Sequence, residues 1–271
     1  MIRALRRFAA TLLACASLGA AASTTFSTDY TDAWITPGEA GHGLFIVQQG
    51  QVMFIAMYVY GGDTLPRWYY ASNVTPVNGS TTSWSGTLYR SQGTSFASPW
   101  NPAQFNQFAV GNLSLVFTSA AAGTLSYTVD NIAVNNQAVS RFAFGADNLA
   151  GVYVGGLTAN VSSCSAQFRP YAIANRLTIQ HSSANPVFIV DWFTPTGAAA
   201  TCTFQGTYTQ QGRISTVSNG TWSCTGGANN AGTFTMTEIE ATRNGISARF
   251  SGKDQYCGSI EGYFGGVRDV L

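Results

Sequence analysis

The residues of this sequence that could do acid–base chemistry gather first in a short glycine-rich stretch. Glu39 and His42 stand among Gly38, Gly41 and Gly43, directly before an apolar run. A carboxylate and an imidazole at this spacing can form a general acid–base pair or contact a ligand at a loop. The structural interpretation is that the Glu39 carboxylate accepts backbone N–H groups and holds the turn. We favour the structural interpretation, because no nucleophile or third catalytic member lies nearby in the sequence.

A second candidate combines one cation with three aromatic rings in the run Arg67-Trp68-Tyr69-Tyr70. Because side chains alternate along a strand, Trp68 and Tyr70 share one face, which can stack on a sugar ring or an apolar ligand. The structural interpretation is core packing, because Trp and Tyr commonly fill β cores. No catalytic residue and no metal ligand is predicted. The predicted ligand-binding residues are Trp34, Glu39, His42, Arg67, Trp68 and Tyr70.

Asp191 interrupts an apolar run at 187–193, where a carboxylate is unexpected. If it is buried, it needs a partner or its pKa rises; otherwise it faces water. With Glu39 it would form a glycosidase-like couple, which is the weaker hypothesis. The sequence has no G-x-S-x-G elbow, H-E-x-x-H helix, phosphate-binding loop or dinucleotide fingerprint, so no cofactor is predicted.

The composition is that of a protein whose polar surface is built from uncharged residues. Only 9% of the 271 residues are charged, and the formal net charge is +1. No basic run is present that would follow a phosphate backbone, which argues against a nucleic-acid partner. Ser, Thr, Asn, Gln and Gly must supply the polar surface, which fits an extracytoplasmic β protein.

The N-terminus has the pattern of a targeting segment. A basic start is followed by an apolar run at 8–20, which is shorter than the roughly 20 residues that cross a bilayer. The small residues at 20–22 match a cleavage site, so residues 1–22 are predicted to be a signal peptide. A lipoprotein anchored at Cys15 is the less favoured alternative, because its apolar region would be only about seven residues long. We therefore expect a secreted or periplasmic protein without a transmembrane segment.

The cysteines that follow this leader all lie in the C-terminal half: Cys164, Cys202, Cys224 and Cys257. An even number in an exported chain predicts two disulfides. Sequence order favours Cys164–Cys202 with Cys224–Cys257, and the other two pairings stay open. A zinc site is less favoured, because no C-x-x-C pair occurs and His181, which we expect to be solvated, is the only histidine nearby.

Short β-branched and aromatic runs recur between Gly and Asn turns, and no segment has a sustained helical period, which predicts an all-β sandwich or barrel. A loose lead-in is expected at 23–33, a type II turn at Trp34–Gly38, and a lid-like loop at 99–105. Strands of the first half are expected at 44–49, 51–60, 67–71, 83–90, 112–117, 124–129 and 138–144.

The strand expected at 51–60 is apolar on both of its faces. An antiparallel strand with one wet face should alternate apolar and polar residues. Something must therefore cover the second face: the other half of the protein, a bound ligand or a partner. Because 187–193 is also nearly continuously apolar, we expect the two halves to pack against each other through these strands.

The second half repeats the first in four places and in the same order, which indicates an internal duplication. We predict an all-β protein of two related antiparallel β-barrel or sandwich-like halves packed together, with domains at 23–147 and 148–271. The matched segments are 44–46 and 54–58 with 177–179 and 188–192, 86–89 with 206–208, 111–113 with 232–234, and 123–125 with 244–246.

One pattern of spaced residues extends over the start of the first half: Trp34-x-x-Pro37-x-Glu39-x-Gly41-x-Gly43, then Gln49-Gly50, then Pro66-x-Trp68-Tyr69. It resembles the W-W-N-P-x-E-S-G-W-G, Q-Q-G and P-x-W-Y elements of an uncharacterised family of exported proteobacterial β-rich proteins. The sequence departs from that pattern at Ile35, Thr36, Ala40 and His42. The family has no established activity, so the resemblance implies export and β architecture and transfers no catalytic residue.

From the sequence we expect a ligand-binding protein rather than an enzyme. The expected ligand is a glycan, an envelope component or an apolar small molecule, held by aromatic residues of the first half. One alternative is a hydrolase or lyase that uses Glu39, His42 or Asp191, which a pocket with converging carboxylates would favour. Another is a structural or interaction module with a protein partner in the cell envelope, which an exposed apolar patch would favour. An outer-membrane barrel is a weaker option.

Overall fold

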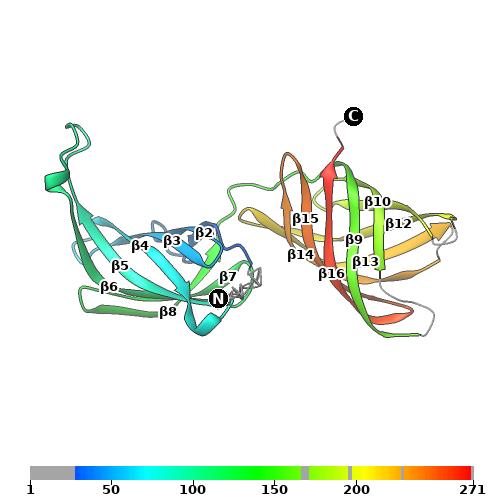
Figure 1. Cartoon of the computed structure of the whole chain (residues 1–271), viewed down its shortest axis with the longest axis horizontal. Coiled ribbons are helices and arrows are strands. Elements are labelled where there is room, and N and C mark those ends of the chain that lie inside the picture. The colour runs from blue at the N-terminus through cyan, green and yellow to red at the C-terminus, as the bar shows by residue number, and fades with distance from the viewer. Residues whose placement is uncertain (1–27, 166–170, 195–196, 227–228, 270–271) are drawn as a thin grey trace, which may run out of the picture.

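The chain folds into two closed antiparallel β-barrels that follow one another in the sequence (Figure 1). The structure is a computed structural model that describes residues 28–165, 171–194, 197–226 and 229–269, without the side chains of 171–175. It confirms the all-β prediction and decides for barrels over sandwiches. The predicted leader at 1–22, with Cys15, lies outside the described residues.

The first barrel contains eight strands. They are β1 (Asp32–Ile35), β2 (Gly43–Gln49), β3 (Val52–Tyr60), β4 (Pro66–Pro76), β5 (Ser83–Gln92), β6 (Asn106–Phe117), β7 (Ala122–Val129) and β8 (Ile132–Arg141). Two short 3₁₀ helices accompany them, η1 (Val77–Gly79) and η2 (Pro102–Gln104). In the part of the chain that the structure describes, no helix is long and apolar enough to cross a membrane.

The second barrel repeats this plan with eight further strands. They are β9 (Gly151–Cys164), β10 (Tyr171–Gln180), β11 (Val187–Phe193), β12 (Ala199–Gln211), β13 (Ile214–Gly226), β14 (Ala231–Ala241), β15 (Gly245–Asp254) and β16 (Cys257–Arg268). In both barrels each strand pairs with its neighbours in the sequence, and the first strand also pairs with the last. Complete closure leaves no open sheet edge.

Strand β1 was missed by the sequence interpretation, which placed a loose lead-in and a turn there. Trp34 lies within this strand and its side chain is 1% exposed, because it fills the first barrel and its indole N–H donates to the Tyr30 carbonyl at 2.9 Å. The turn itself begins two residues later. Gly38 has a φ of +83°, as a type II turn requires, and the Glu39 N–H donates to the Thr36 carbonyl at 3.1 Å.

Each barrel buries its own apolar core, and strand β3 shows how the two sides are divided. Met53, Ile55 and Met57 point inward and are fully buried. The opposite face, which includes Phe54 and Tyr58, remains exposed. The expectation that the two halves pack through this strand is therefore wrong, because each barrel is filled by its own inward side chains and needs no partner to cover them.

A shared closing contact supports the predicted duplication. In the first barrel, Arg141 of β8 lies over the ring of its strand partner Trp34 of β1, with its guanidinium carbon 5.2 Å from the ring centroid. In the second barrel, Arg268 of β16 lies over its strand partner Tyr153 of β9 at 5.6 Å. Both rings also hydrogen-bond to the carbonyl four residues earlier. The same cation–π contact thus joins the first and last strands of each barrel.

Three of the four sequence matches fall on strands of the same rank in the two barrels: β2 and β3 with β10 and β11, β6 with β14, and β7 with β15. The match between 86–89 and 206–208 is wrong, because it joins β5 to β12, the counterpart of β4. The strand of the same rank as β5 is β13. It also carries an inward tryptophan, Trp222 for Trp84.

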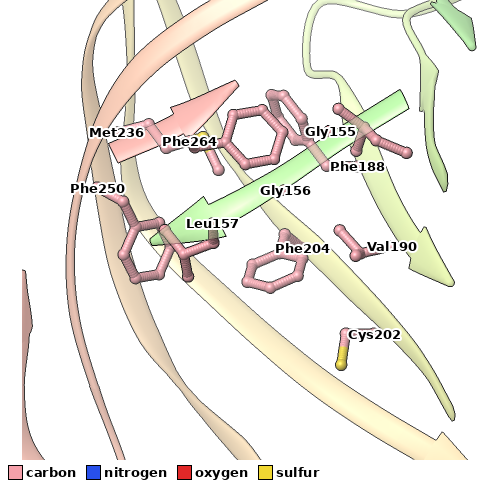
Figure 2. Close-up of a pocket in the computed structure, with 11 residues that line it drawn as sticks. Gly155, Gly156, Leu157, Phe188, Val190, Cys202, Phe204, Met236, Phe250 and Phe264 are labelled. Carbon is pink, nitrogen blue, oxygen red and sulfur yellow. The ribbon is translucent and has the colours of Figure 1, made fainter. Parts of the chain in front are cut away.

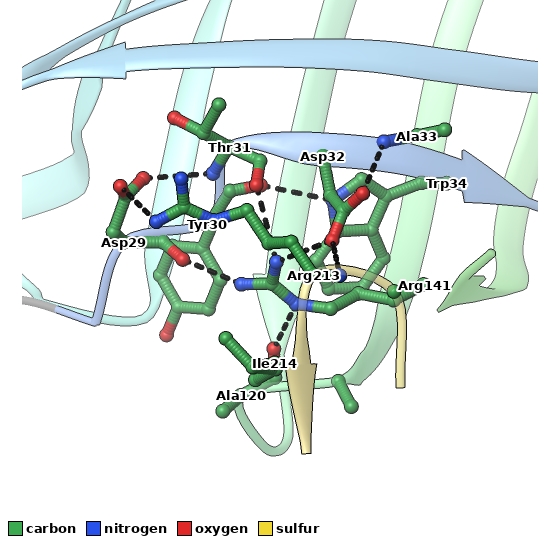
Figure 3. A network of polar contacts seen from close by, with 12 residues as sticks. Asp29, Tyr30, Thr31, Asp32, Ala33, Trp34, Ala120, Arg141, Arg213 and Ile214 are labelled. Atoms are coloured by element: carbon green, nitrogen blue, oxygen red, sulfur yellow. Dashed lines mark hydrogen bonds and ion pairs between the residues drawn. The ribbon is translucent and has the colours of Figure 1, made fainter. Parts of the chain in front are cut away.

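The two barrels contact each other where the turn between β12 and β13 reaches the start of β1 (Figure 3). The backbone N–H of Arg213 donates to the Asp32 carboxylate at 2.8 Å, and its guanidinium donates to Asp29 at 2.7 Å. Gly212 has a φ of +62° and faces Asp32, where a Cβ atom would collide with the carboxylate. The interface is therefore polar and depends on a tight glycine turn.

Both disulfides of the second barrel link neighbouring strands. Cys202 and Cys224 face each other on β12 and β13, and Cys164 and Cys257 face each other on β9 and β16. The predicted number is confirmed, but the favoured pairing in sequence order is wrong, because strand register decides which cysteines meet. Two disulfides fit a protein of an oxidising compartment.

Candidate functional site

The first barrel presents a continuous group of aromatic side chains on its outer surface, which we call the aromatic face. These side chains come from four consecutive strands and point away from the core. They are Phe45 of β2, Phe54 and Tyr58 of β3, Trp68 and Tyr70 of β4, and Tyr89 of β5.

Strand register explains why these residues converge. One row across the sheet runs from Phe45 through Ala56 and Tyr70 to Tyr89, each residue opposite the next. The period of two along β3 adds Phe54 and Tyr58, two residues before and after Ala56, on the same face. The small Ala56 side chain thus stands among large rings.

Ring contacts hold the aromatic face in order. Tyr70 is the hub: its ring stacks with Trp68 at 5.8 Å and with Phe54 at 6.3 Å, and contacts Tyr89 at 5.8 Å, all between ring centroids. Phe45 and Tyr58 meet edge to face at 5.6 Å. Such pairs add about 0.5–1.5 kcal/mol beyond burial, so the rings are arranged before any ligand arrives.

The rings of the aromatic face remain accessible in spite of these contacts. Trp68 is 53% exposed, Phe45 is 50% exposed and Phe54 is 44% exposed. Sequence reasoning named Trp68 and Tyr70, but it missed Phe45, Phe54, Tyr58 and Tyr89. For Phe54 and Tyr58 the signal was the apolar second face of β3, whereas Phe45 of β2 and Tyr89 of β5 join the group through strand register.

Glu39 and His42 form a polar border beside the aromatic face. The Glu39 carboxylate contacts His42 Nδ1 at 3.0 Å and accepts from the Gln137 side chain of β8 at 2.9 Å. The His42 ring packs against Tyr60 at 5.4 Å, and Tyr60 continues the outward side of β3. Glu39 thus binds side chains rather than the backbone N–H groups expected from the sequence, and the whole group is open to water.

Arg67 directly precedes Trp68 on β4, so its side chain leaves the strand on the side opposite to the aromatic face. Its guanidinium donates to the Asp63 carboxylate at 2.5 Å across the β3–β4 turn. The pKa of Asp63 is lowered, first by the hydrogen bond from the Leu65 N–H and then by Arg67. Asp63 therefore serves the turn, as its Gly-rich setting predicts.

Two other predicted residues do not reach this site. The burial of Trp34 inside the barrel prevents any contact with a surface ligand, so we remove it from the ligand-binding set. Asp191 lies in the second barrel, exposed on β11, where its carboxylate accepts from the Thr201 hydroxyl at 2.8 Å. A couple of Asp191 with Glu39 would need residues from two different barrels.

The second barrel encloses an apolar cavity of about 30 Å³ among its inward side chains (Figure 2). Phe188, Phe204, Phe250 and Phe264 converge on it, together with Met236. Small-molecule sites usually enclose about 300–1,000 Å³. This space is a packing defect that accommodates no ligand.

A groove of about 700 Å³ runs over the outside of β9 and β14–β16. Its charged side chains already have partners: Arg249 contacts the neighbouring Glu238 at 3.6 Å and the Tyr263 hydroxyl at 3.2 Å, and Glu261 accepts from the Ser251 hydroxyl at 2.7 Å. A ligand would have to break these contacts, whereas the aromatic face is accessible as it stands.

His181 gives the protein an expected pH dependence. Its Nδ1 accepts from the Leu149 N–H at 3.1 Å, which requires an unprotonated nitrogen, and burial lowers its pKa below the ordinary 6.5. The unfolded chain therefore binds more protons just below pH 6.5, so this stability is present above that pH and is lost as the pH falls toward the folded pKa. Sequence reasoning had expected a solvated residue here.

Urea unfolding of wild type and His181→Gln from about pH 8 to about pH 5 measures this effect. The wild-type midpoint should fall more steeply below about pH 6.5 than that of the variant. His42 is present in both proteins, so the difference isolates His181. Equal slopes would contradict the assignment.

Comparison with known proteins adds no relative to this geometry. The chain matches no family model, no curated protein and no solved structure. The candidate site therefore rests on its own chemistry.

Proposed function

We propose that the chain is a glycan-binding protein that works outside the cytoplasm and holds its ligand against the aromatic face. The observation that carries this proposal is the arrangement of Trp68, Tyr70 and Phe54. These three rings are stacked on one another, partly exposed and uncovered by the second barrel. A protein surface on which several large aromatic side chains are exposed to water usually binds a partner.

The chemistry of the face favours a glycan. The axial C–H groups of a pyranose ring pack on the electron-rich face of an aromatic ring, while its hydroxyls need polar neighbours. Tyr58, Tyr70 and Tyr89 carry hydroxyls within the face, and the Glu39 carboxylate lies at its border. An open strip across four strands suits an extended chain of sugar rings.

An apolar small molecule is supported less well. Such ligands prefer enclosed sites that bury most of their surface. The enclosed apolar space of the second barrel holds only about 30 Å³. A hydrolase built on Glu39 and Asp191 is also less supported, because these carboxylates belong to different barrels.

Three observations support a location outside the cytoplasm. Disulfides such as Cys202–Cys224 persist in oxidising compartments. The N-terminal residues have the pattern of a cleaved signal peptide, and the pattern from Trp34 to Tyr69 resembles that of exported proteins. We therefore propose a secreted or periplasmic protein.

Replacing Trp68 with alanine is expected to weaken glycan binding about 30-fold, because an exposed aromatic anchor commonly contributes about 2 kcal/mol to binding. Folding should be nearly unaffected, because the ring lies on the surface. The test is titration calorimetry of the oxidised protein with soluble β-glucans, chito-oligosaccharides and peptidoglycan fragments. A thermal-shift screen selects the glycan, since a ligand at 100 times its dissociation constant adds about 2.7 kcal/mol.

Phe193→Ala is the matched control, since Phe193 is an exposed aromatic residue on β11, the strand of the second barrel that corresponds to β3. It should bind like wild type. If Trp68→Ala binds like this control, the aromatic face is not the glycan site. If no glycan binds the wild type, the proposal fails and the face is better explained as a surface for a protein partner in the envelope.

A further inference from the structure

The hairpin between β5 and β6 extends beyond the end of the first barrel (Figure 1). Every residue from 95 to 109 is exposed, so the tip does not pack on the barrel. The sequence interpretation of 99–105 as a lid-like loop does not fit this position. Between residues 96 and 105 the tip carries three exposed aromatic residues: Phe96, which is completely exposed, Trp100, which is 64% exposed, and Phe105, which is 47% exposed.

The tip is ordered by its own hydrogen bonds. The Thr94 hydroxyl accepts from the Asn101 N–H at 2.9 Å and donates to the Asn101 carbonyl at 3.2 Å, which ties the two sides of the loop together. The Asn101 side chain accepts from the Ala103 N–H at 3.0 Å. Trp100 and Phe105 lie 6.2 Å apart, centroid to centroid. The aromatic residues are thus displayed on a defined support.

Most backbone N–H groups between residues 97 and 105 are bonded within the loop. Residues 97–105 include Pro99 and Pro102, which have no N–H, and at least six of the seven others donate within the loop. Internal hydrogen bonds lower the cost of bringing these N–H groups into the interface of a bilayer.

The charge pattern fits a membrane surface with anionic headgroups. Residues 91–107 contain no charged side chain, and no Asp or Glu occurs between Asp63 and Asp130. Charged groups are costly inside a bilayer, whereas Trp is favoured at its interface. Arg90 lies at the base of the hairpin over the Phe108 ring, 5.7 Å from its centroid. A cation at this depth would meet lipid phosphates.

We propose that the β5–β6 hairpin is a membrane anchor. It inserts Phe96, Trp100 and Phe105 into the interface of a phospholipid bilayer and places Arg90 at the level of the phosphates. The narrow tip favours insertion into lipid over docking on a protein, because its rings extend from one loop rather than forming a flat patch. This inference does not depend on glycan binding, since the aromatic face uses other residues.

Co-sedimentation of the whole oxidised chain with vesicles tests the anchor. Vesicles of phosphatidylethanolamine with phosphatidylglycerol should bind the protein more tightly than vesicles of phosphatidylcholine alone. The triple variant Phe96→Ser, Trp100→Ser, Phe105→Ser should lose at least about tenfold in affinity, because apolar burial in the interface drives binding. Arg90→Gln should lose affinity for the anionic vesicles alone.

The matched control replaces three exposed apolar residues of the second barrel, Val154→Ser, Phe193→Ser and Val267→Ser, and should bind vesicles like wild type. Circular dichroism verifies that both triple variants fold. The proposal is overturned if wild type ignores both kinds of vesicle or if the hairpin variant binds like the control. It is also overturned if sedimentation velocity shows a hairpin-dependent dimer without vesicle binding, since the occupant is then a second copy.

Discussion

Asp32→Ala is expected to lower the free energy of unfolding of the first barrel by about 3–5 kcal/mol, the usual effect of removing one partner of a buried ion pair. The Arg141 guanidinium is fully buried and donates to the Asp32 carboxylate at 2.8 Å. Burial lowers the pKa of Arg141, and the hydrogen bond to Asp32 opposes this shift. Without Asp32 the cation keeps the Trp34 ring and uncharged carbonyl partners, among them the Ala120 carbonyl at 2.7 Å (Figure 3).

The double variant Asp32→Leu, Arg141→Met provides the control for this experiment. Replacing both charges by apolar side chains is often neutral, so the double variant should be more stable than Asp32→Ala alone. Urea unfolding followed by tryptophan fluorescence and by circular dichroism measures both proteins. If Asp32→Ala lowers the free energy of unfolding by less than about 1 kcal/mol, the Asp32–Arg141 pair behaves like an exposed ion pair, and its assignment as a buried pair is wrong.

Asp32 also connects the two barrels, so its removal has a second expected consequence. The Arg213 N–H donates to the same carboxylate oxygen that pairs with Arg141. Loss of this acceptor leaves the β12–β13 turn with the Asp29–Arg213 ion pair, which is partly exposed to water and contributes less than a buried pair. We expect the variant to unfold in two separated transitions, because the coupling between the barrels is weakened.

Removing the Cys164–Cys257 disulfide is expected to lower the free energy of unfolding by about 4.7 kcal/mol in the chain-entropy model. The bond joins residues 93 apart, and it links β9 to β16, the pair that closes the second barrel. Without this bond the unfolded chain has a higher conformational entropy, which favours unfolding. The double variant Cys164→Ala, Cys257→Ala, measured by urea unfolding, tests this expectation.

The second disulfide serves as the comparison. Cys202 and Cys224 are only 22 residues apart, so Cys202→Ala, Cys224→Ala should cost about 3.4 kcal/mol by the same model. The ordering of the two variants is the informative result, since both bonds link neighbouring strands of one barrel. If removing Cys202–Cys224 costs more than removing Cys164–Cys257, loop entropy does not govern their contributions.

The secondary structure of this protein was predictable because its signals are local. Short apolar runs between glycine and asparagine turns predicted β2 to β8, although β4, β6 and β8 each extend five or six residues beyond one end of the expected range. The Pro37-Gly38 turn followed from the backbone preferences of these two residues. Strand β1 was missed because it contains only four residues, and its pairing with β2 and β8 supplies most of what keeps it extended.

The candidate site was predictable in part. The alternation of β4 placed Trp68 and Tyr70 on one face, but the pattern alone did not say whether that face looked inward or outward. The structure turns it outward, because Tyr69 and Ala71 fill the barrel instead. Phe45 and Tyr89 joined the face only through strand register, which the sequence of a single strand does not contain.

The sequence by itself determined that this protein is β-rich, internally repeated and equipped with four cysteines in its C-terminal half. These properties follow from the residue period along single strands and from counting. Only the tertiary structure decided which cysteines meet, which face of β3 contacts water, and that Asp32 binds Arg213, 181 residues away. Such contacts depend on barrel closure and on the register of strands distant in the chain, so no local pattern specifies them.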